Sequence, residues 1–433
     1  MVVPAQSVED GRVGLQAIEG YIAVVTLKGV DGDRRKLVQR YADRIKQSRP
    51  LKNDVLERYL LFMNDLPGAF AQATIKPSMG IPGASDMHVQ FTQQMVQGGL
   101  SLDNRGGKSQ GPLRLNADVG LNSGLGLQES TRVRFVHSLS DELIFGSLSH
   151  DQTIGPDGGK LSLSASLSKS KPEELAFIPL NLETSSQSAA LMYSYPLIRS
   201  RAQNLSVRGS FTLHEGETKI FNVQDTRDST RAVRLGATYD IADAWGGVNL
   251  LDVELSQGIH GLGSSDNNDL FLSRRNGRVD FTKATLYAAR LQSLLPRLSF
   301  LAAVSGQYAF TDLLSSELYG FGGEQFGRGY DPSELVGDHG IAMKLELRYT
   351  ITAPGFLDSS YTAYTFYDAG IVYQRTSGGF NDSDSAASAG LGLRVTFGRH
   401  VSAYAEMAKP LTRDVSAEGN RDLRGYAGIS LRF

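Results

Sequence analysis

From Gly98 to the C-terminus the sequence alternates apolar and polar residues with a period of two, the pattern of a β-strand with two different faces. The clearest run is Ile341–Tyr349. Its apolar residues share one face: Ile341, Met343, Leu345, Leu347 and Tyr349. The residues between them share the other: Ala342, Lys344, Glu346 and Arg348. Unpaired charge is too costly to bury in a sandwich core, but the polar face of a membrane barrel lines a watery lumen while the apolar face meets lipid.

The same alternation predicts a mainly β chain with about 16 antiparallel strands, an even number as bacterial transmembrane barrels require. We expect the strands at 98–104, 112–121, 130–138, 142–152, 159–169, 184–195, 203–215, 227–241, 246–258, 276–290, 297–311, 338–351, 358–374, 386–397, 399–408 and 424–433.

The links between these strands alternate in length. Links such as 195–203 and 241–246 are short, whereas those such as 170–184 and 311–338 are long and rich in Ser, Asp, Asn and Gly. Outer-membrane barrels have short periplasmic turns and long extracellular loops. This segregation favours a transmembrane barrel over the alternative, a soluble β-sandwich.

Residues 1–97 have a different character, with helical as well as strand periodicity. Apolar residues recur at three- and four-residue spacing in 33–46 and 52–64, which predicts two helices. Strands are expected at 13–28, 69–76 and 87–96. The order β-α-α-β-β indicates a small independent α+β module before the barrel.

Composition narrows the class of protein. The 433 residues carry a net charge of −2 with both signs mixed, so nothing indicates nucleic-acid binding. With no cysteine, disulfides and thiolate metal sites are excluded. Mean hydropathy is −0.21 and no window approaches the roughly 18 apolar residues of a membrane helix. Forty-seven glycines, 17 tyrosines and 19 phenylalanines fit a barrel with aromatic girdles.

Motifs for catalysis are missing. The seven histidines are scattered without metal-ligand spacing, and no nucleophile elbow or phosphate-binding loop occurs. We therefore expect no catalytic residues, no metal, no cofactor and no enzymatic activity. The Asp- and Asn-rich segment Ser264–Asp269 fits either a weak calcium site or a solvated loop.

One segment stands out for its glycines and aromatics: Tyr319–Tyr330, reading YGFGGEQFGRGY, with Arg328 between two glycines. Glycine permits positive φ and close packing, so the segment suits a folded loop. In strand 358–374 the phase places Asp368 on the inward face. A charge-assisted pair between Arg328 and Asp368 would pin the loop in the lumen; an ordinary solvated arginine is the alternative.

The chain resembles the outer-membrane transporters of two-partner secretion, of the haemolysin-activator type. These belong to a superfamily that couples periplasmic POTRA domains to a 16-stranded barrel. The segment ERYLLFMNDLPGAFAQATIKP (57–77) is similar to the family's second POTRA domain, and SLDNRGG (101–107) is similar to its first barrel hairpin.

The resemblance implies a site. In the superfamily the sixth extracellular loop folds into the barrel and carries a [V/I]RG[Y/F] motif, which Arg328, Gly329 and Tyr330 match and from which Gly327 departs. A strand motif, F-x-D-x-G, matches Phe366, Asp368 and Gly370, and its aspartate partners the loop arginine. The resemblance thus implies a sixth-loop latch.

The resemblance also implies a domain plan. Residues 1–26 are expected to be the remnant of a first POTRA domain, 27–97 a POTRA domain, and 98–433 the barrel, with an inward loop at 312–337. The first residues show no basic or apolar signal region, so we expect no signal peptide and a chain that is a fragment or starts late.

The function implied is an outer-membrane pore that recognises a large exoprotein in the periplasm through its POTRA domain and secretes, and can activate, that exoprotein. Other expected partners are outer-membrane lipid and the barrel-assembly machinery. Three alternatives remain open: a barrel-assembly insertase of the same superfamily, a diffusion porin, and a barrel hydrolase.

Overall fold

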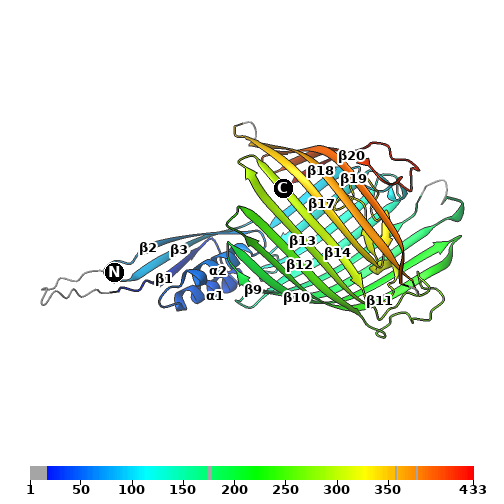
Figure 1. The fold of residues 1–433 in the computed structure, drawn as a ribbon. Helices are drawn as coiled ribbons and strands as arrows, with labels where there is room; N and C mark the ends of the chain where they lie inside the picture. Colours follow the sequence, from blue (N-terminus) through cyan, green and yellow to red (C-terminus); the bar gives the residue numbers. More distant parts are fainter. Residues whose placement is uncertain (1–16, 173–177, 356–357, 377–378) are drawn as a thin grey trace, which may run out of the picture.

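The computed structural model describes residues 17–172, 178–355, 358–376 and 379–433. They form a closed β-barrel with a small α+β module projecting from one end (Figure 1). Residues 1–16 lie outside the described residues, and with them the start of the expected strand 13–28 and most of the expected region 1–26.

The module follows the expected order β-α-α-β-β. Its elements are β1 (Tyr21–Lys28), α1 (Arg34–Gln47), α2 (Asn53–Asn64), β2 (Ala69–Pro77) and β3 (Ala84–Gln93). The sheet order is β1-β3-β2, with β1 parallel and β2 antiparallel to the central β3. Among the described residues, no further strand pairs with the outer edge of β1 or of β2.

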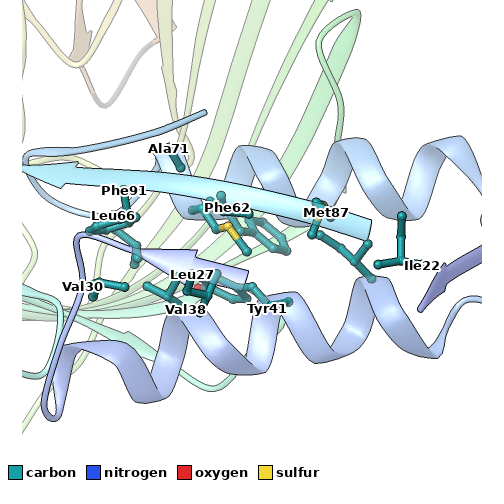
Figure 2. Packing of buried hydrophobic residues seen from close by; sticks show 14 residues of the cluster. Ile22, Leu27, Val30, Val38, Tyr41, Phe62, Leu66, Ala71, Met87 and Phe91 are labelled. Atoms are coloured by element: carbon teal, nitrogen blue, oxygen red, sulfur yellow. The ribbon is translucent and has the colours of Figure 1, made fainter. Parts of the chain in front are cut away.

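The core of the module lies between the helices and one face of the sheet (Figure 2). On α1 the buried residues are Val38, Tyr41, Ala42 and Ile45, which repeat at helical spacing. They pack with Phe62 of α2 and Met87 of β3, and none of these six side chains is more than 3% exposed. The three- and four-residue periodicity of the sequence is thus the pattern of this core.

The expected boundary between residues 26 and 27 is misplaced, because it falls inside β1. Tyr21 to Lys28 pair with Ala84 to Gln90 along most of β3, so β1 is part of the module's own sheet. The end of the module also moves. β3 stops at Gln93, and Val96 already begins the first barrel strand, β4.

The described residues confirm the predicted barrel of 16 strands. In chain order these are β4 (Val96–Asp103), β5 (Arg114–Asn122), β6 (Glu129–Ser138), β7 (Leu143–Ile154), β8 (Gly159–Ser170), β9 (Glu183–Arg199), β10 (Gln203–Ile220), β11 (Val223–Ala242), β12 (Gly247–Gly258), β13 (Thr282–Leu295), β14 (Leu298–Ala309), β17 (His339–Ala353), β18 (Ser359–Thr376), β19 (Gly379–Phe397), β20 (Val401–Pro410) and β21 (Arg424–Arg432). Neighbours pair antiparallel, and β21 closes the ring on β4.

Burial follows the alternation of the sequence. On β17, Ile341 and Leu347 are 52% and 38% exposed on the outside, whereas Glu346 is 1% exposed on the inside. On β8, Leu163 and Leu167 point outward at 51% and 61% exposure. The outer surface is thus an apolar band suited to lipid, and the lumen is polar.

The links between barrel strands also differ in length between the two ends of the barrel. Links at the module end are short, for example 155–158, 200–202 and 243–246. The long links, such as 104–113, 259–281, 310–338 and 411–423, all lie at the other end. That end also has short connections, at 139–142 and 221–222, so the rule holds for long loops but not for every link.

Several strand boundaries differ from the prediction. The expected strand 276–290 begins only at Thr282. Before it, the N–H groups of Gly277 and Arg278 donate to the loop carbonyls of Arg274 and Asp312 instead of to a barrel strand. The expected strands 203–215 and 227–241 are too short at the outer end. β10 and β11 continue as a polar hairpin to a turn at Phe221 and Asn222, both at positive φ.

The module is docked on the barrel through its helices. Arg58 of α2 donates to the carbonyl of Pro196 at 2.9 Å, and Asp65, just after α2, accepts two hydrogen bonds from Arg199 at 2.6 and 2.7 Å. Tyr59 donates to Asp157 at 3.1 Å. These contacts hold the module against the turns that join β7 to β8 and β9 to β10, at the end of the barrel from which it projects (Figure 1).

Candidate functional site

The glycine-rich segment lies in the link between β14 and β17, which folds back into the lumen. A single 3-10 turn, Ser315–Glu317, leads into β15 (Tyr319–Phe321), which pairs with β16 (Leu335–Gly337) as a small hairpin. Residues 322–334 form its tip. Strands of three residues are too short to show a period, so the sequence did not predict the hairpin.

The hairpin has its own apolar core against the barrel wall. Its buried side chains are Tyr319, Phe321, Phe326, Tyr330 and Leu335. They pack on small inward residues of the wall: Ala303, Ala342, Val372 and Ala386. Small residues on the wall make room for large residues on the loop, so the loop fills this side of the lumen as a close-packed element.

Arg328 at the tip is 1% exposed, and Asp368 on β18 is fully buried. The arginine donates from Nε to Asp368 Oδ2 at 2.9 Å and from Nη2 to Oδ1 at 2.8 Å. The backbone N–H of Arg328 and that of Gly327 donate to the same Oδ2 at 3.0 and 3.2 Å. Asp368 therefore accepts a bidentate guanidinium and two backbone donors.

A second carboxylate shares the arginine. Nη1 of Arg328 donates to Glu346 on β17, which is 1% exposed. Glu346 also accepts from Arg348 at 2.6 Å and from Arg394 at 2.8 Å. The guanidinium carbon of Arg328 lies 3.5 Å from the ring centroid of Phe366, within cation–π range. Breaking one partner of such a buried pair costs about 3–5 kcal/mol, because a charge is left uncompensated.

The two residues after Arg328 continue the contact. Gly329 donates its backbone N–H to Ser388 Oγ at 3.2 Å, and an added Cβ would lie 2.7 Å from the Cβ of Ser388. Tyr330, 1% exposed, donates from its hydroxyl to the carbonyl of Ala387 at 3.1 Å. The loop tip thus reaches across β18 to β19.

The departure at Gly327 from an aliphatic residue has a local reason. Gly327 has φ +90°, and an added Cβ would lie 2.8 Å from the ring of Phe321. A β-branched residue is strained at this φ. In this chain the space beside the arginine is filled by Phe321 instead.

The three residues of the expected strand motif all face the loop. Phe366, 4% exposed, lies under the guanidinium, and Asp368 binds it. Gly370 lies beneath Phe321, whose Cδ2 would be 2.3 Å from an added Cβ. The structure therefore brings together all six residues expected at this site, from Arg328, Gly329 and Tyr330 to Phe366, Asp368 and Gly370.

Charged contacts also hold the base of the loop. Glu317, 5% exposed, pairs with Arg234 at 2.7 Å and with Lys283 at 2.8 Å. Burial acts to raise the pKa of Glu317, but Lys283 and Arg234 outweigh it and hold this pKa below the usual range. Asp338 accepts a bidentate pair from Arg274 of the 259–281 loop at 2.7 and 2.9 Å.

The partners other than Asp368 were missed from the sequence. Glu346 was placed on the lumen face of its strand, but nothing linked it to Arg328. The signal lies in the strand register, which pairs Lys344 with Asp368 and so puts Glu346 one lumen position away. Glu317, Asp338 and their cations lie on separate elements, and only the folded chain joins them.

The opposite wall of the lumen is built differently. On β8 five successive inward positions are serine: Ser162, Ser164, Ser166, Ser168 and Ser170. Ser166 lies opposite Ser147 of β7 and Ser188 of β9. We call β7–β9 the serine wall and β17–β20, which binds the loop tip, the latch wall.

The described residues hold no group of three or more His, Asp and Glu side chains placed to bind a metal. In the Asp- and Asn-rich loop, Asn267 is engaged by Asp280 and by the N–H of Val279. The helices found in the described part of the chain are all too short or too polar to cross a membrane.

Comparison with known proteins places the chain in a family. Residues 83–395 match the model of the haemolysin secretion/activation proteins ShlB/FhaC/HecB. The outer membrane transporter CdiB of Dickeya dadantii is 24% identical over 79% of this chain and 61% of its own length. The heme/hemopexin transporter protein HuxB of Haemophilus influenzae is 23% identical over 96% of this chain and 74% of its own length.

Solved structures share the fold. CdiB from Escherichia coli superposes with a TM-score of 0.80 at 20% identity, covering all of this chain and 80% of that structure. BamA from Haemophilus ducreyi lacking POTRA domains 1–3 gives a TM-score of 0.60 at 12% identity over 96% of this chain and 85% of that structure. Both likenesses concern the fold alone.

Proposed function

The chain belongs to the family of haemolysin secretion/activation proteins and forms an outer-membrane β-barrel, and we propose that it secretes a large partner exoprotein through this barrel. One observation carries the proposal. A polar lumen has a folded α+β module fixed at one mouth and a loop bound inside by Arg328. A diffusion porin needs neither of these elements.

We assign the module, a POTRA domain by its resemblance, the capture of the exoprotein in the periplasm. In the sheet order β1-β3-β2, β2 pairs with no described strand other than β3. Asn64 occupies the outward N–H and C=O of Ala71, and no described strand covers the outer edge from Ala73 to Pro77. An extended chain can add to such an edge by backbone hydrogen bonds. Phe70 of β2 is 62% exposed and offers an apolar contact beside that edge.

In the proposed cycle the sixth loop is a latch. With Arg328 bound to Asp368 and Glu346, the loop occupies the lumen on the side of the latch wall. The exoprotein passes the lumen as an extended chain, and its folding outside draws the rest forward. Folding of a domain releases about 5–15 kcal/mol, which biases the direction of transport without a nucleotide.

The test is co-expression with a large secreted protein encoded beside this chain. We expect the exoprotein in the medium when both are present, and in the periplasm when the barrel protein is absent. An exoprotein without its N-terminal secretion domain serves as the control and should stay in the periplasm. Equal amounts in the medium with and without the barrel protein would reject the proposal.

The same strains separate secretion from membrane insertion of other proteins. A barrel-assembly insertase would change the level of β-barrel proteins in the outer membrane on deletion. We expect that level to stay constant. A loss of outer-membrane barrels with normal exoprotein secretion would assign the protein to assembly instead.

A further inference from the structure

The barrel closes through its shortest strand pairing. β21 pairs with β4 only from Gly428–Asp103 to Arg432–Gly99. The adjacent pairing of β20 with β21 runs from Val401–Leu431 to Ala408–Arg424. Since each pair adds backbone hydrogen bonds and side-chain contact, this seam has the least strand pairing to hold it.

Asn104 continues the seam where β4 ends. Its backbone N–H donates to the carbonyl of Ala427 at 3.2 Å. Its side-chain Nδ2 donates to the carbonyl of Gly425 at 3.0 Å, and its Oδ1 accepts the N–H of Ala427 at 2.7 Å. The amide side chain thus takes the place of a further strand residue opposite β21.

Arg105 then reaches over β21 to the next strand. It is 7% exposed, and its Nη2 donates to Glu406 Oε1 of β20 at 2.5 Å. Its guanidinium carbon lies 4.2 Å from the ring centroid of Tyr426 on β21. The next residue must be glycine, because a Cβ on Gly106 would lie 1.9 Å from the carbonyl oxygen of Gly111.

Glu406 also faces the sixth loop. Its Oε2 accepts the hydroxyl of Tyr364 at 2.7 Å and lies 3.8 Å from Nη1 of Arg328. A single buried carboxylate therefore stands between the arginine of the first loop and the arginine of the sixth. Removal of either arginine changes the charge balance felt by the other.

The last strand contacts the loop tip directly as well. Arg424 of β21 pairs with Asp331 at 2.5 Å and donates to the carbonyl of Gly329 at 3.2 Å. The loop tip thus binds β21 itself as well as the latch wall beside it.

We propose that Asn104 and Arg105 form a clasp that holds the first and last barrel strands together, and that Glu406 couples this clasp to the Arg328 latch. When Arg328 leaves its site, Glu406 and Arg424 each lose a partner and the seam loosens. The clasp gives a role to the SLDNRGG segment that the latch alone does not explain. This inference concerns the barrel and needs no secretion substrate.

The test is amide hydrogen exchange of the protein in detergent, followed by mass spectrometry. We expect Arg105→Ala to raise exchange in peptides from 424–433 by about tenfold, which corresponds to a loss of about 1.4 kcal/mol of local stability. Peptides from β13 and β14, on a distant part of the barrel, should not change. Unchanged exchange in 424–433 would overturn the clasp.

A double variant tests whether the clasp is coupled to the Arg328 latch. We expect Arg328→Ala alone to raise exchange in 424–433, and the double variant Arg105→Ala/Arg328→Ala to give less than the sum of the two effects in free energy. A merely structural role of Arg105 predicts no effect of Arg328→Ala on this segment, or simple additivity. Either of these results would reject the coupling.

A disulfide supplies the matched rescue, and the natural chain has no cysteine to interfere. Ser101 and Ser430 lie opposite each other across the seam, as Ser166 and Ser188 do on the serine wall. Ser101→Cys/Ser430→Cys should restore protection to Arg105→Ala when oxidised, and Ser166→Cys/Ser188→Cys should not. Equal rescue by both pairs would contradict a local clasp.

If Arg105→Ala does not insert into the membrane, Arg105→Lys replaces it. Lysine keeps the charge for Glu406 but loses the planar contact with Tyr426. We expect a smaller rise in exchange at 424–433, and no rise would overturn the proposal.

Discussion

The two walls of the lumen are both polar, yet they interact with the sixth loop in opposite ways. The latch wall presents buried carboxylates, Glu346, Asp368 and Glu406, none more than 3% exposed. On the serine wall, β8 presents short neutral hydroxyls, and the carboxylate of Asp151 on β7 accepts a hydrogen bond from one of them, Ser162, at 2.5 Å. No side-chain hydrogen bond joins Ser164, Ser166 or Ser168 to another described residue.

The difference shows what a polar inward face can be used for. Buried carboxylates demand a cationic partner, since a charge without one is expensive; a loop that carries Arg328 is therefore held in one place. Serine hydroxyls are small and neutral and make no such demand. The same period-two alternation thus produces a binding surface on one side and a smooth surface on the other.

Removal of Arg328 should have the largest effect, because it removes the charge that holds the sixth loop on the latch wall. Arg328→Ala leaves Asp368 and Glu346 without their shared cation. The conformation in which the sixth loop lies in the lumen is then destabilised by about 3–5 kcal/mol. We expect secretion to fall by more than about tenfold and the conductance of the pore in planar bilayers to rise, with normal insertion. Arg421→Ala, which removes an arginine 52% exposed in a long loop, is the control. Normal secretion by Arg328→Ala would refute the latch.

Gly370→Ala should act on the same wall without changing a charge. The new Cβ would lie 2.3 Å from the ring of Phe321, and overpacking of this kind costs about 1–3 kcal/mol. We expect faster proteolysis of the sixth loop, partly corrected by Phe321→Leu. Gly146→Ala on β7, where an added Cβ meets nothing within 4 Å, should leave proteolysis unchanged. Equal effects of the two alanines would mean that loop packing is not limiting.

Acid should release the base of the loop. The pKa of Glu317 is lowered in the folded protein, so its stabilising pairs with Lys283 and Arg234 are complete above its ordinary pKa of 4.5. They are lost only as pH falls through the lower folded value. We expect pore current fluctuations to stay constant from about pH 8 to pH 5 and to grow at lower pH. Glu317→Gln should fluctuate at neutral pH already; a quiet Glu317→Gln pore would contradict this role.

The smallest effect is expected on the serine wall. Ser164→Ala/Ser166→Ala removes two hydroxyls that hold no described partner, so proteolysis of the sixth loop should match that of the natural protein. Secretion should change by less than about twofold, equivalent to about 0.4 kcal/mol. A larger loss would show that these hydroxyls do more than leave the lumen open.

The fold could be predicted where apolar outward residues and polar inward residues alternate along a strand. On β17 the alternation from Ile341 to Tyr349 specifies both faces, and the same logic turned Asp368 inward. It failed where strands leave the membrane. The outer parts of β10 and β11 are polar on both faces, so the apolar pattern ended before the strands did.

The site could be predicted only as far as local motifs reach. Arg328 and Asp368 were paired from their motifs and strand phase, and the structure places them in contact; the function of the latch stays a prediction. Glu346 needed the register between β17 and β18. Glu406 needed the closed ring, because β20 is distant from the loop in sequence, and no single-strand pattern carries that information.

Docking of the module has a mechanical consequence. Arg58, Tyr59 and Asp65 tie one rigid body to the turns after β7 and β9, and Gln128 after β5 donates to the carbonyl of Arg34 at 3.0 Å. These contacts hold the part of the barrel mouth between β5 and β10 in a fixed position. Among the described residues these contacts reach the links and strand ends between β5 and β10, so we expect any widening of this mouth to be concentrated between β11 and β21, on the side of the loop.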